Sequence, residues 1–437
     1  MSTQYGICPS FHTFWARHIL FADPMLRAKA FVVFDDAGNP TQELSPLDVD
    51  GWPRLDGRWH GAVLFADMAG TSPLLEPSAG GPRIKQNGNG ASISWKTERP
   101  RLAPLSPFTS AGFYQPGLVA IRQFTPATLR TLDWQRTNEK PDWSKPRVSV
   151  HDPIQGSARG MALEFQIAAA NATRSALWWP APPRFELSVP LWQAKIGEML
   201  QVIRDNCAVP PVIEWGNEAW NEGFKLNSWL HAETKGTTAR WTDIAAREIN
   251  YLWEVVDRVF DIGRARKFVG GHIQDPSVLE KIIRASPRMP DLAGPAVYVG
   301  ALKNDMLAWE ANGTVPDQVK LRDSTLRRAV EVDAKLDQHA QVCSRYGIKL
   351  AVYEAGQSFI ANGKPWKAAA IQAQREEWMR EVYVAIRSMC ERRGVSVANF
   401  YSLMTSQNPG DSRVDVFGLA EGMGLPLLAK AQAAMGR

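Results

Sequence analysis

Two glutamates stand at the ends of apolar segments and are followed by residues that suit a substrate pocket. Residues 213–221 read Ile-Glu-Trp-Gly-Asn-Glu-Ala-Trp-Asn, so an apolar run passes into a cluster of Glu, Asn and Trp around Glu218. Residues 350–357 read Leu-Ala-Val-Tyr-Glu-Ala-Gly-Gln, and this apolar run ends on Glu354 before small residues. Two carboxyl groups held close together can divide a reaction between them, because the protonated one donates a proton while the ionised one attacks.

Hydrolysis of a glycosidic bond requires such a pair of carboxyl groups. One carboxylic acid protonates the leaving oxygen, and the other carboxylate attacks the anomeric carbon. A single glutamate at the end of a strand is more often a capping or salt-bridge residue. The hypothesis of a glycosidase therefore depends on Glu218 and Glu354 being present together.

The segments that would position these glutamates alternate between short apolar strands and amphipathic helices. The expected strands are residues 5–8, 127–134, 175–182, 210–218, 266–274, 293–300, 348–356 and 395–404. The clearest expected helices are residues 160–171, 189–206, 241–261, 324–346 and 368–393. Strands that alternate with helices favour parallel βαβ units. Eight strands of this kind predict a (β/α)8 barrel, in which the carboxyl ends of the strands form the active face.

Residues 40–120 do not follow this alternation. They are rich in Gly, Pro and Ser and contain short alternating stretches such as AVLFADM and ASISW. We expect a mostly β insertion after the first strand of a single barrel domain that spans residues 1–437. A separate small domain is the alternative interpretation.

The two motifs together resemble clan A of the retaining glycoside hydrolases, a (β/α)8 superfamily that includes cellulases and mannanases. In that clan the acid/base follows an Asn after the fourth strand, as in Asn217-Glu218, and the nucleophile ends the seventh strand, as Glu354 does. This resemblance covers residues 120–430. The likeness to bacterial or phage-borne members extends further, through Leu-Asp-Val-Asp-Gly-Trp-Pro at 47–53 and Glu-Trp-Gly-Asn-Glu-Ala-Trp-Asn at 214–221.

The resemblance also implies roles for residues around the two glutamates. Arg130 corresponds to a strand-two arginine beside the nucleophile, and Tyr298 to a strand-six tyrosine whose hydroxyl touches it. Asn217 would contact the 2-hydroxyl of the sugar. Two positions depart from the clan, because residues 178–180 read Trp-Trp-Pro where many members carry His, and residues 400–404 contain no Trp.

Aromatic and polar residues near the expected strand ends complete the candidate binding site. The chain has 17 tryptophans, and flat sugar faces stack on aromatic rings, although filling of the core is the competing explanation. The further candidates for substrate binding are Trp134, Asn138, Trp179, Trp220, His272 and Gln274. We expect a groove lined by some of Trp134, Trp143, Trp178, Trp179, Trp215 and Trp220.

Composition and charge narrow the classes of partner. The 437 residues carry 50 basic and 45 acidic side chains without a basic run, which argues against nucleic-acid binding. The four cysteines and seven histidines form no metal-binding pattern, so we expect neither a metal nor a cofactor. No apolar segment is long enough to predict a membrane span. The first residues do not read as a secretory signal, which predicts a cytoplasmic or virion-associated protein.

Two hypotheses follow from these observations. The first is a retaining glycoside hydrolase that acts on an oligosaccharide or polysaccharide. The second is a non-catalytic protein on a glycosidase-like barrel, which either binds carbohydrate or forms part of a phage virion or tail beside other virion proteins. Both carboxylates are present in the sequence, which favours the enzyme.

Overall fold

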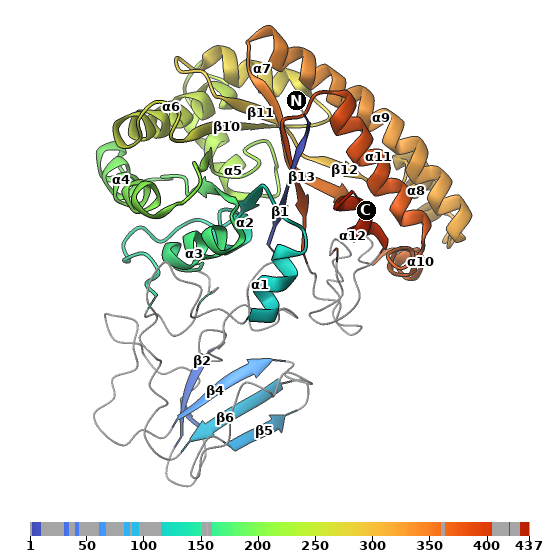
Figure 1. Ribbon diagram of the computed structural model, residues 1–437, viewed down its shortest axis with the longest axis horizontal. Coiled ribbons are helices and arrows are strands. Elements are labelled where there is room, and N and C mark those ends of the chain that lie inside the picture. Colours follow the sequence, from blue (N-terminus) through green and yellow to red (C-terminus); the bar gives the residue numbers. More distant parts are fainter. Residues whose placement is uncertain are drawn as a thin grey trace.

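The computed structural model shows a barrel of parallel strands surrounded by helices, with a second sheet that belongs to the chain after the first strand (Figure 1). It describes residues 2–9, 115–150, 155, 160–359, 363–403, 419 and 429–436, together with the backbone of five strands between 30 and 95. The motif at residues 47–53 lies outside the described residues.

The barrel is built from parallel strands that pair in chain order and close on themselves. Its strands are β1 (Gln4–Cys8), β7 (Thr128–Arg130), β8 (Ala176–Ala181), β9 (Val212–Trp215), β10 (Arg266–Gly271), β11 (Leu292–Pro295), β12 (Val297–Val299), β13 (Lys349–Gln357) and β14 (Val397–Tyr401). Both β11 and β12 pair with β13, so they occupy one position, and the pairing of β1 with β14 closes an eight-stranded barrel. The predicted (β/α)8 fold is confirmed.

Helices connect the strands and cover the outside of the barrel (Figure 1). They are α1 (Gln115–Arg122), α2 (Leu132–Gln135), α3 (Leu163–Thr173), α4 (Val189–Asn206), α5 (Lys225–Glu233), α6 (Trp241–Val259), α7 (Pro276–Ala285), α8 (Lys303–Ala311), α9 (Gln318–Arg345), α10 (Lys367–Ala373), α11 (Trp378–Arg392) and α12 (Ala429–Ala434). Side chains cap the first turns of two of these helices. Asp275 and Asp317 accept backbone N–H bonds at the first turns of α7 and α9, which satisfies donors that a helix start leaves free.

Several elements begin or end at other residues than the sequence predicts, and the contacts explain two of these differences. The strand expected at residues 127–134 ends at Arg130, and the chain then forms the single turn α2, in which the N–H of Gln135 bonds to the carbonyl of Thr131. The helix expected at 368–393 is divided into α10 and α11. At the break, the side-chain amide of Gln374 donates to the carbonyl of Ala370 at 2.9 Å, and this acceptor would serve the backbone N–H of residue 374 in a continuous helix.

The five strands between β1 and α1 form a separate antiparallel sheet. They are β2 (Ala30–Phe34), β3 (Pro40–Gln42), β4 (Gly61–Ala66), β5 (Arg83–Asn87) and β6 (Gly90–Trp95), in the order β3-β2-β4-β6-β5. These strands lie in and just before the region where a β insertion is expected, and the first of them begins at Ala30, before the expected limit of residue 40. The insertion follows the carboxyl end of β1.

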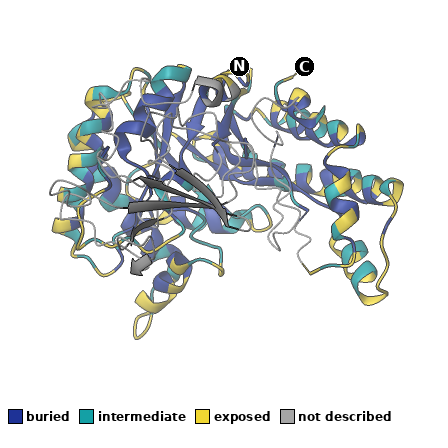
Figure 2. Ribbon diagram, turned by 90° about the horizontal axis from the view of Figure 1, so that it is seen from below, coloured by how far each residue is buried: buried dark blue, intermediate teal, exposed yellow. Residues whose placement is uncertain are grey.

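Apolar side chains fill two layers, one between strands and helices and one inside the barrel. Helices show a buried face toward the strands and an exposed face outward, whereas the strands are buried on both sides (Figure 2). The inner layer contains Trp178, Val212, Phe268, Leu292, Ala351, Tyr353 and Val397. A fully buried parallel barrel explains why the strands read as continuous apolar runs. It also provides a rigid rim from which polar side chains can project.

Candidate active site

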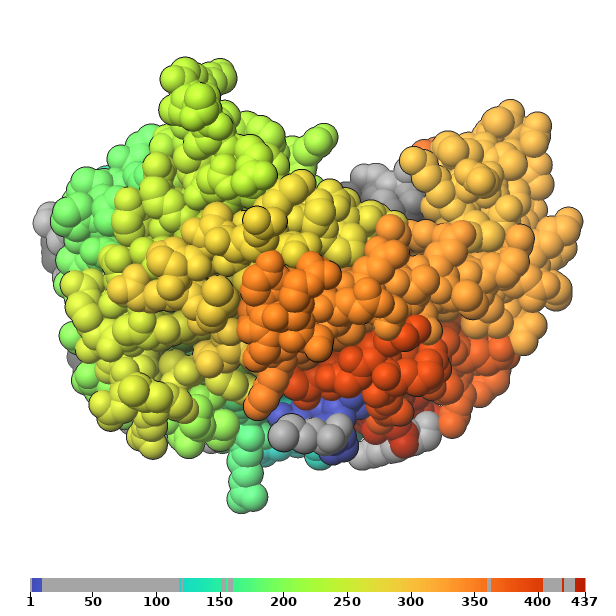
Figure 3. Space-filling model, turned by 90° about the horizontal axis from the view of Figure 1, so that it is seen from above, coloured from blue at the N-terminus to red at the C-terminus, as the bar shows by residue number. Residues whose placement is uncertain are grey.

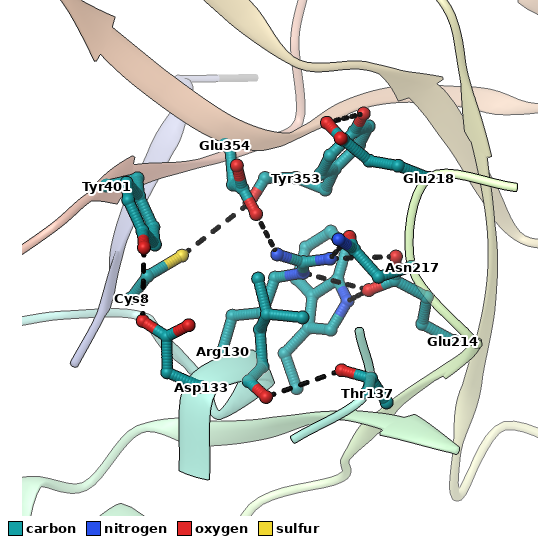
Figure 4. A network of polar contacts seen from close by, with 12 residues as sticks. Cys8, Arg130, Asp133, Thr137, Glu214, Asn217, Glu218, Tyr353, Glu354 and Tyr401 are labelled. Atoms are coloured by element: carbon teal, nitrogen blue, oxygen red, sulfur yellow. Dashed lines mark hydrogen bonds and ion pairs between the residues drawn. The ribbon is translucent and has the colours of Figure 1, made fainter. Parts of the chain in front are cut away.

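The polar residues of the candidate site come from different strands and meet where those strands end. Arg130 is the last residue of β7, Glu218 follows β9, and Glu354 lies near the end of β13. Because the strands are parallel, their carboxyl ends lie on the same side of the barrel. Figure 4 shows these side chains pointing toward one another.

Arg130 is the centre of the polar network. Its side chain is fully buried, and its Nε and Nη2 donate to the two oxygens of Glu214 at 2.8 and 2.9 Å. Nη1 donates to Oε1 of Glu354 at 2.6 Å, and Nη2 also donates to Oδ1 of Asn217 at 2.8 Å (Figure 4). A guanidinium keeps its charge in proteins and offers donors in a rigid planar fork. One cation is therefore shared between two buried carboxylates, which leaves negative charge in the site.

Glu354 is oriented by a donor on each of its oxygens. Arg130 bonds to Oε1, and the hydroxyl of Tyr298, on β12, donates to Oε2 at 2.6 Å. The carboxyl group is almost fully buried, with the residue 5% exposed. These contacts hold Glu354 in one position at the mouth of the barrel, as covalent attack on a bound substrate requires.

Glu218 has a different environment from that of Glu354. Its Oε1 accepts from the hydroxyl of Tyr353 at 3.0 Å and its Oε2 from the side-chain amide of Asn221 at 2.8 Å. Burial, and after it the negative charge of Glu354, raises the pKa of Glu218 from 4.5 to about 7. A carboxyl group with this pKa is partly protonated at neutral pH, which suits a general acid that becomes a base in a later step.

The loop after β9 holds Glu218 in a backbone conformation that side chains rarely adopt. Glu218 has a φ of +42°, in the left-handed region, and Gly216 precedes it with a φ of +61°. A side chain at Gly216 would also bring a Cβ within 2.7 Å of Leu226. A left-handed conformation at a residue other than glycine costs about 1–3 kcal/mol and is concentrated at functional sites. The loop therefore maintains the position of Glu218 at some expense of stability.

The structure joins two of the other expected residues, Asn217 and Asn138, to this network. Asn217 bonds to Arg130 through its oxygen, and its amide donates to Oδ1 of Asn138 at 2.8 Å. Trp220 stacks on His272 with ring centroids 4.2 Å apart, and both are partly exposed. Gln274, in contrast, is exposed in the turn after β10, and it makes no hydrogen bond with the network in the described part of the chain.

Two of the tryptophans expected to bind substrate are fully buried. Trp134 and Trp179 are 0% exposed and belong to the layer between strands and helices. Side chains alternate between the faces of a strand, so Trp178 points into the barrel, where its Nε1 donates to Glu214 at 2.8 Å, while Trp179 points outward. Most of the tryptophans expected to line a groove are buried, including Trp178 and Trp215.

A hollow on the surface lies beside the strand ends rather than at the buried tryptophans. Figure 3 shows it between the segment that contains α5 and the segment that contains α8. Helix α5 follows β9 and the loop that contains Glu218. Helix α8 follows β12, the strand that carries Tyr298. A separate cavity of about 600 Å³ lies on the outer side of β8, where Trp143 and Trp179 contribute to its lining. That cavity does not contain the paired carboxylates.

Several residues of the site were not expected from the sequence. Glu214 was part of a motif without a role, yet it is the bidentate partner of Arg130. Tyr353, beside the nucleophile candidate, bonds to Glu218. Asp133 and Tyr401 are joined by a hydrogen bond of 3.2 Å near Glu354. A buried arginine needs negative charges beside it. The sequence signal for this role was that Glu214 is an acidic residue in the apolar segment just before Glu218.

Among the described residues, no group of three or more His, Cys, Asp or Glu side chains is arranged to hold a metal ion. None of the helices that the structure describes is both long and apolar enough to span a bilayer.

The fold is similar to solved glycoside hydrolase structures. The chain matches the GH51 arabinofuranosidase from Xanthomonas axonopodis pv. citri with a TM-score of 0.50 and 15% identity, over 76% of this chain and 68% of that one. A family 26 endo-beta-1,4-mannanase from Cellulomonas fimi matches with a TM-score of 0.40 and 16% identity, over 73% and 69% of the two chains. An intracellular xylanase from Thermoanaerobacterium saccharolyticum matches with a TM-score of 0.45 and 10% identity, over 72% and 90%.

Comparisons at the level of sequence add no relative. No family model matches the chain, and no curated protein does. The expected resemblance to the barrels of clan A glycoside hydrolases is confirmed at the level of the fold. At this level of identity the likeness shows the (β/α)8 fold alone, because one fold can carry many different functions.

Proposed function

We propose that this protein is a retaining glycoside hydrolase, with Glu354 as nucleophile and Glu218 as acid/base. One observation supports the proposal most directly, namely the different environments of the two carboxyl groups at the same barrel mouth. Glu354 is bound by Arg130 and Tyr298, whereas burial and the charge of Glu354 raise the pKa of Glu218 to about 7. Pairs of carboxyl groups in contrasting environments are typical of acid and nucleophile in such enzymes.

The first step would form a covalent ester between the sugar and the enzyme. Glu354 attacks the anomeric carbon while the bond from that carbon to the leaving oxygen breaks, and Glu218 donates its proton to this oxygen. Water replaces the leaving group in the second step. Ionised Glu218 takes a proton from the water, the oxygen of the water attacks the anomeric carbon, and the bond to Glu354 breaks.

The surrounding residues would bind and orient the substrate during these steps. Asn217 is held between Arg130 and Asn138, which suits contact with the 2-hydroxyl of the sugar that is attacked. Trp220 lies two residues after Glu218 and stacks on His272. Because the acid must reach the leaving oxygen, this aromatic pair would border the leaving-group side of the site.

The experiment that tests this function traps the covalent ester. A panel of aryl glycosides and polysaccharides first identifies a sugar that is cleaved, and a 2-fluoro glycoside of that sugar with a good leaving group is then incubated with the protein. Mass spectrometry of a digest should find the added sugar on the peptide that contains Glu354, and Glu354→Gln should abolish the label. Glu218→Ala should impair substrates with poor leaving groups far more than activated ones, because only the former need the acid.

A matched variant controls for general effects of charge. Glu222 is exposed on the same loop as Glu218, and Glu222→Gln should label and cleave like the wild type. A sugar that binds without ever labelling Glu354, and that both active-site variants bind like the wild type, would exclude the enzyme. The carbohydrate-binding or virion-structural hypothesis would then replace it.

A further inference from the structure

Besides Glu214, Glu218 and Glu354, a further carboxyl group lies in the site and has no part in the two-step reaction. Asp133 is the second residue of α2, directly after the end of β7, and it is partly exposed. Its Oδ2 accepts a hydrogen bond of 3.2 Å from the hydroxyl of Tyr401, the last residue of β14. Among the described residues, no hydrogen bond reaches its other oxygen, Oδ1.

Asp133 feels the charge of the nucleophile Glu354, and none of the ion pairs between described residues includes it. Burial, followed by the negative charge of Glu354, raises the pKa of Asp133 to about 7. Arg130 forms ion pairs with Glu214 and Glu354 but with no atom of Asp133. Keeping a carboxylate ionised without an ion-pair partner and without full exposure to water is costly, and groups of this kind are concentrated at functional sites.

The position of Asp133 defines which part of a substrate it faces. Glu218 extends from the loop after β9. Asp133 follows β7 and Tyr401 ends β14, and these are the two strands that flank β1. Figure 4 shows Glu218 and Asp133 on different sides of Glu354. Because Glu218 must face the leaving oxygen, Asp133 faces the part of the attacked sugar ring that is remote from the leaving group.

Building on the proposed function, we propose that Asp133 accepts hydrogen bonds from hydroxyl groups of the sugar that Glu354 attacks, on the side away from the leaving group. Above about pH 7 the carboxyl group of Asp133 is mostly ionised. An ionised carboxylate only accepts hydrogen bonds, and bonds to charged groups are stronger than neutral ones. The substrate would therefore be a sugar with free hydroxyls at this place. Tyr401 would act as a positioning residue that orients Asp133.

The test measures whether Asp133 and one particular hydroxyl act together. The aryl glycoside that the wild type cleaves is compared with its monodeoxy analogues in the wild type and in Asp133→Ala. For the analogue that lacks the contacted hydroxyl, kcat/KM of the wild type should fall by about 10- to 100-fold, the range expected for a bond to a charged group. In Asp133→Ala the same deletion should cost less than about 3-fold, while deletions at other positions keep their wild-type effect.

Two further variants keep the test decisive. Asp133→Asn retains an acceptor but not the charge, so it should reduce the coupling to about 2- to 10-fold, and it decides the matter if Asp133→Ala fails to fold. Asp142→Asn is the matched control, because Asp142 is a carboxylate of the following loop, bonded to Ser144, and every deoxy effect should remain as in the wild type.

The outcomes separate this proposal from the function on which it rests. If Glu354 is labelled but every deoxy analogue loses the same factor in Asp133→Asn as in the wild type, Asp133 is only an acceptor for Tyr401 and the proposal fails alone. If Glu354 is never labelled, the glycosidase function fails and the assignment of Asp133 falls with it.

Discussion

Replacing Glu218 by Gln should make the protein more stable at alkaline pH than the wild type. The fold raises the pKa of Glu218 from 4.5 to about 7, which means that it disfavours the ionised form. Stability associated with this group is fully present below pH 4.5 and is lost as the pH rises to about 7. A glutamine stays neutral at every pH, so Glu218→Gln removes this loss.

The magnitude follows from the two pKa values. Their difference, at about 1.4 kcal/mol per unit, corresponds to roughly 3 kcal/mol of unfolding free energy. The side chain is partly exposed at the mouth of the barrel, so water screens part of this effect and we expect about 2 kcal/mol. The gain should be present at pH 8 and absent at pH 4.5.

The assay is urea denaturation of wild type and variant at both pH values, followed by tryptophan fluorescence. The quantity of interest is the change in the variant's advantage between the two pH values. This difference cancels any constant cost of placing an amide beside Tyr353 and Asn221. Glu222→Gln, on the exposed part of the same loop, should change stability by less than about 0.5 kcal/mol at either pH. An advantage that is equal at both pH values, or larger at the lower one, would refute the argument from burial and from the charge of Glu354.

The remaining predictions concern the charge network and the pH dependence of activity. Cleavage of substrates with poor leaving groups should decline as the pH rises through about 7, because Glu218 then loses the proton that it donates; a pH profile of kcat/KM that stays flat to pH 9 would contradict this role. Arg130→Met leaves the buried carboxylates of Glu214 and Glu354 without their cation. The free energy of unfolding, measured in urea at pH 8, should therefore be about 3–5 kcal/mol lower than in the wild type. The difference should be smaller at pH 5, where carboxyl groups can protonate. Tyr298→Phe removes the 2.6 Å hydrogen bond to Glu354 and should lower kcat by about 10- to 100-fold with little change in melting temperature; unchanged kinetics would mean that the hydroxyl does not assist the nucleophile.

The alternation of apolar strands and amphipathic helices was readable from the sequence. A parallel barrel buries both faces of its strands, so each strand leaves a continuous apolar run, and helix α4 (Val189–Asn206) has the limits that its apolar spacing predicts. The same pattern located Glu218 and Glu354, because a polar residue after an apolar run marks the end of a strand. In the structure Glu218 lies three residues after the end of β9, and Glu354 lies three residues before the end of β13.

Tertiary structure alone decided which side chains meet and which faces they occupy. Trp178 and Trp179 are neighbours of the same type, yet one contacts Glu214 inside the barrel and the other packs against helices. The choice depends on how β8 pairs with the strands beside it, and a shift by one residue would exchange the two faces. Asp133 and Tyr401 are 268 positions apart and meet only because β1 pairs with both β7 and β14. Local patterns record the period of an element, whereas contacts of this kind arise from strand pairing between distant segments, which no local pattern contains.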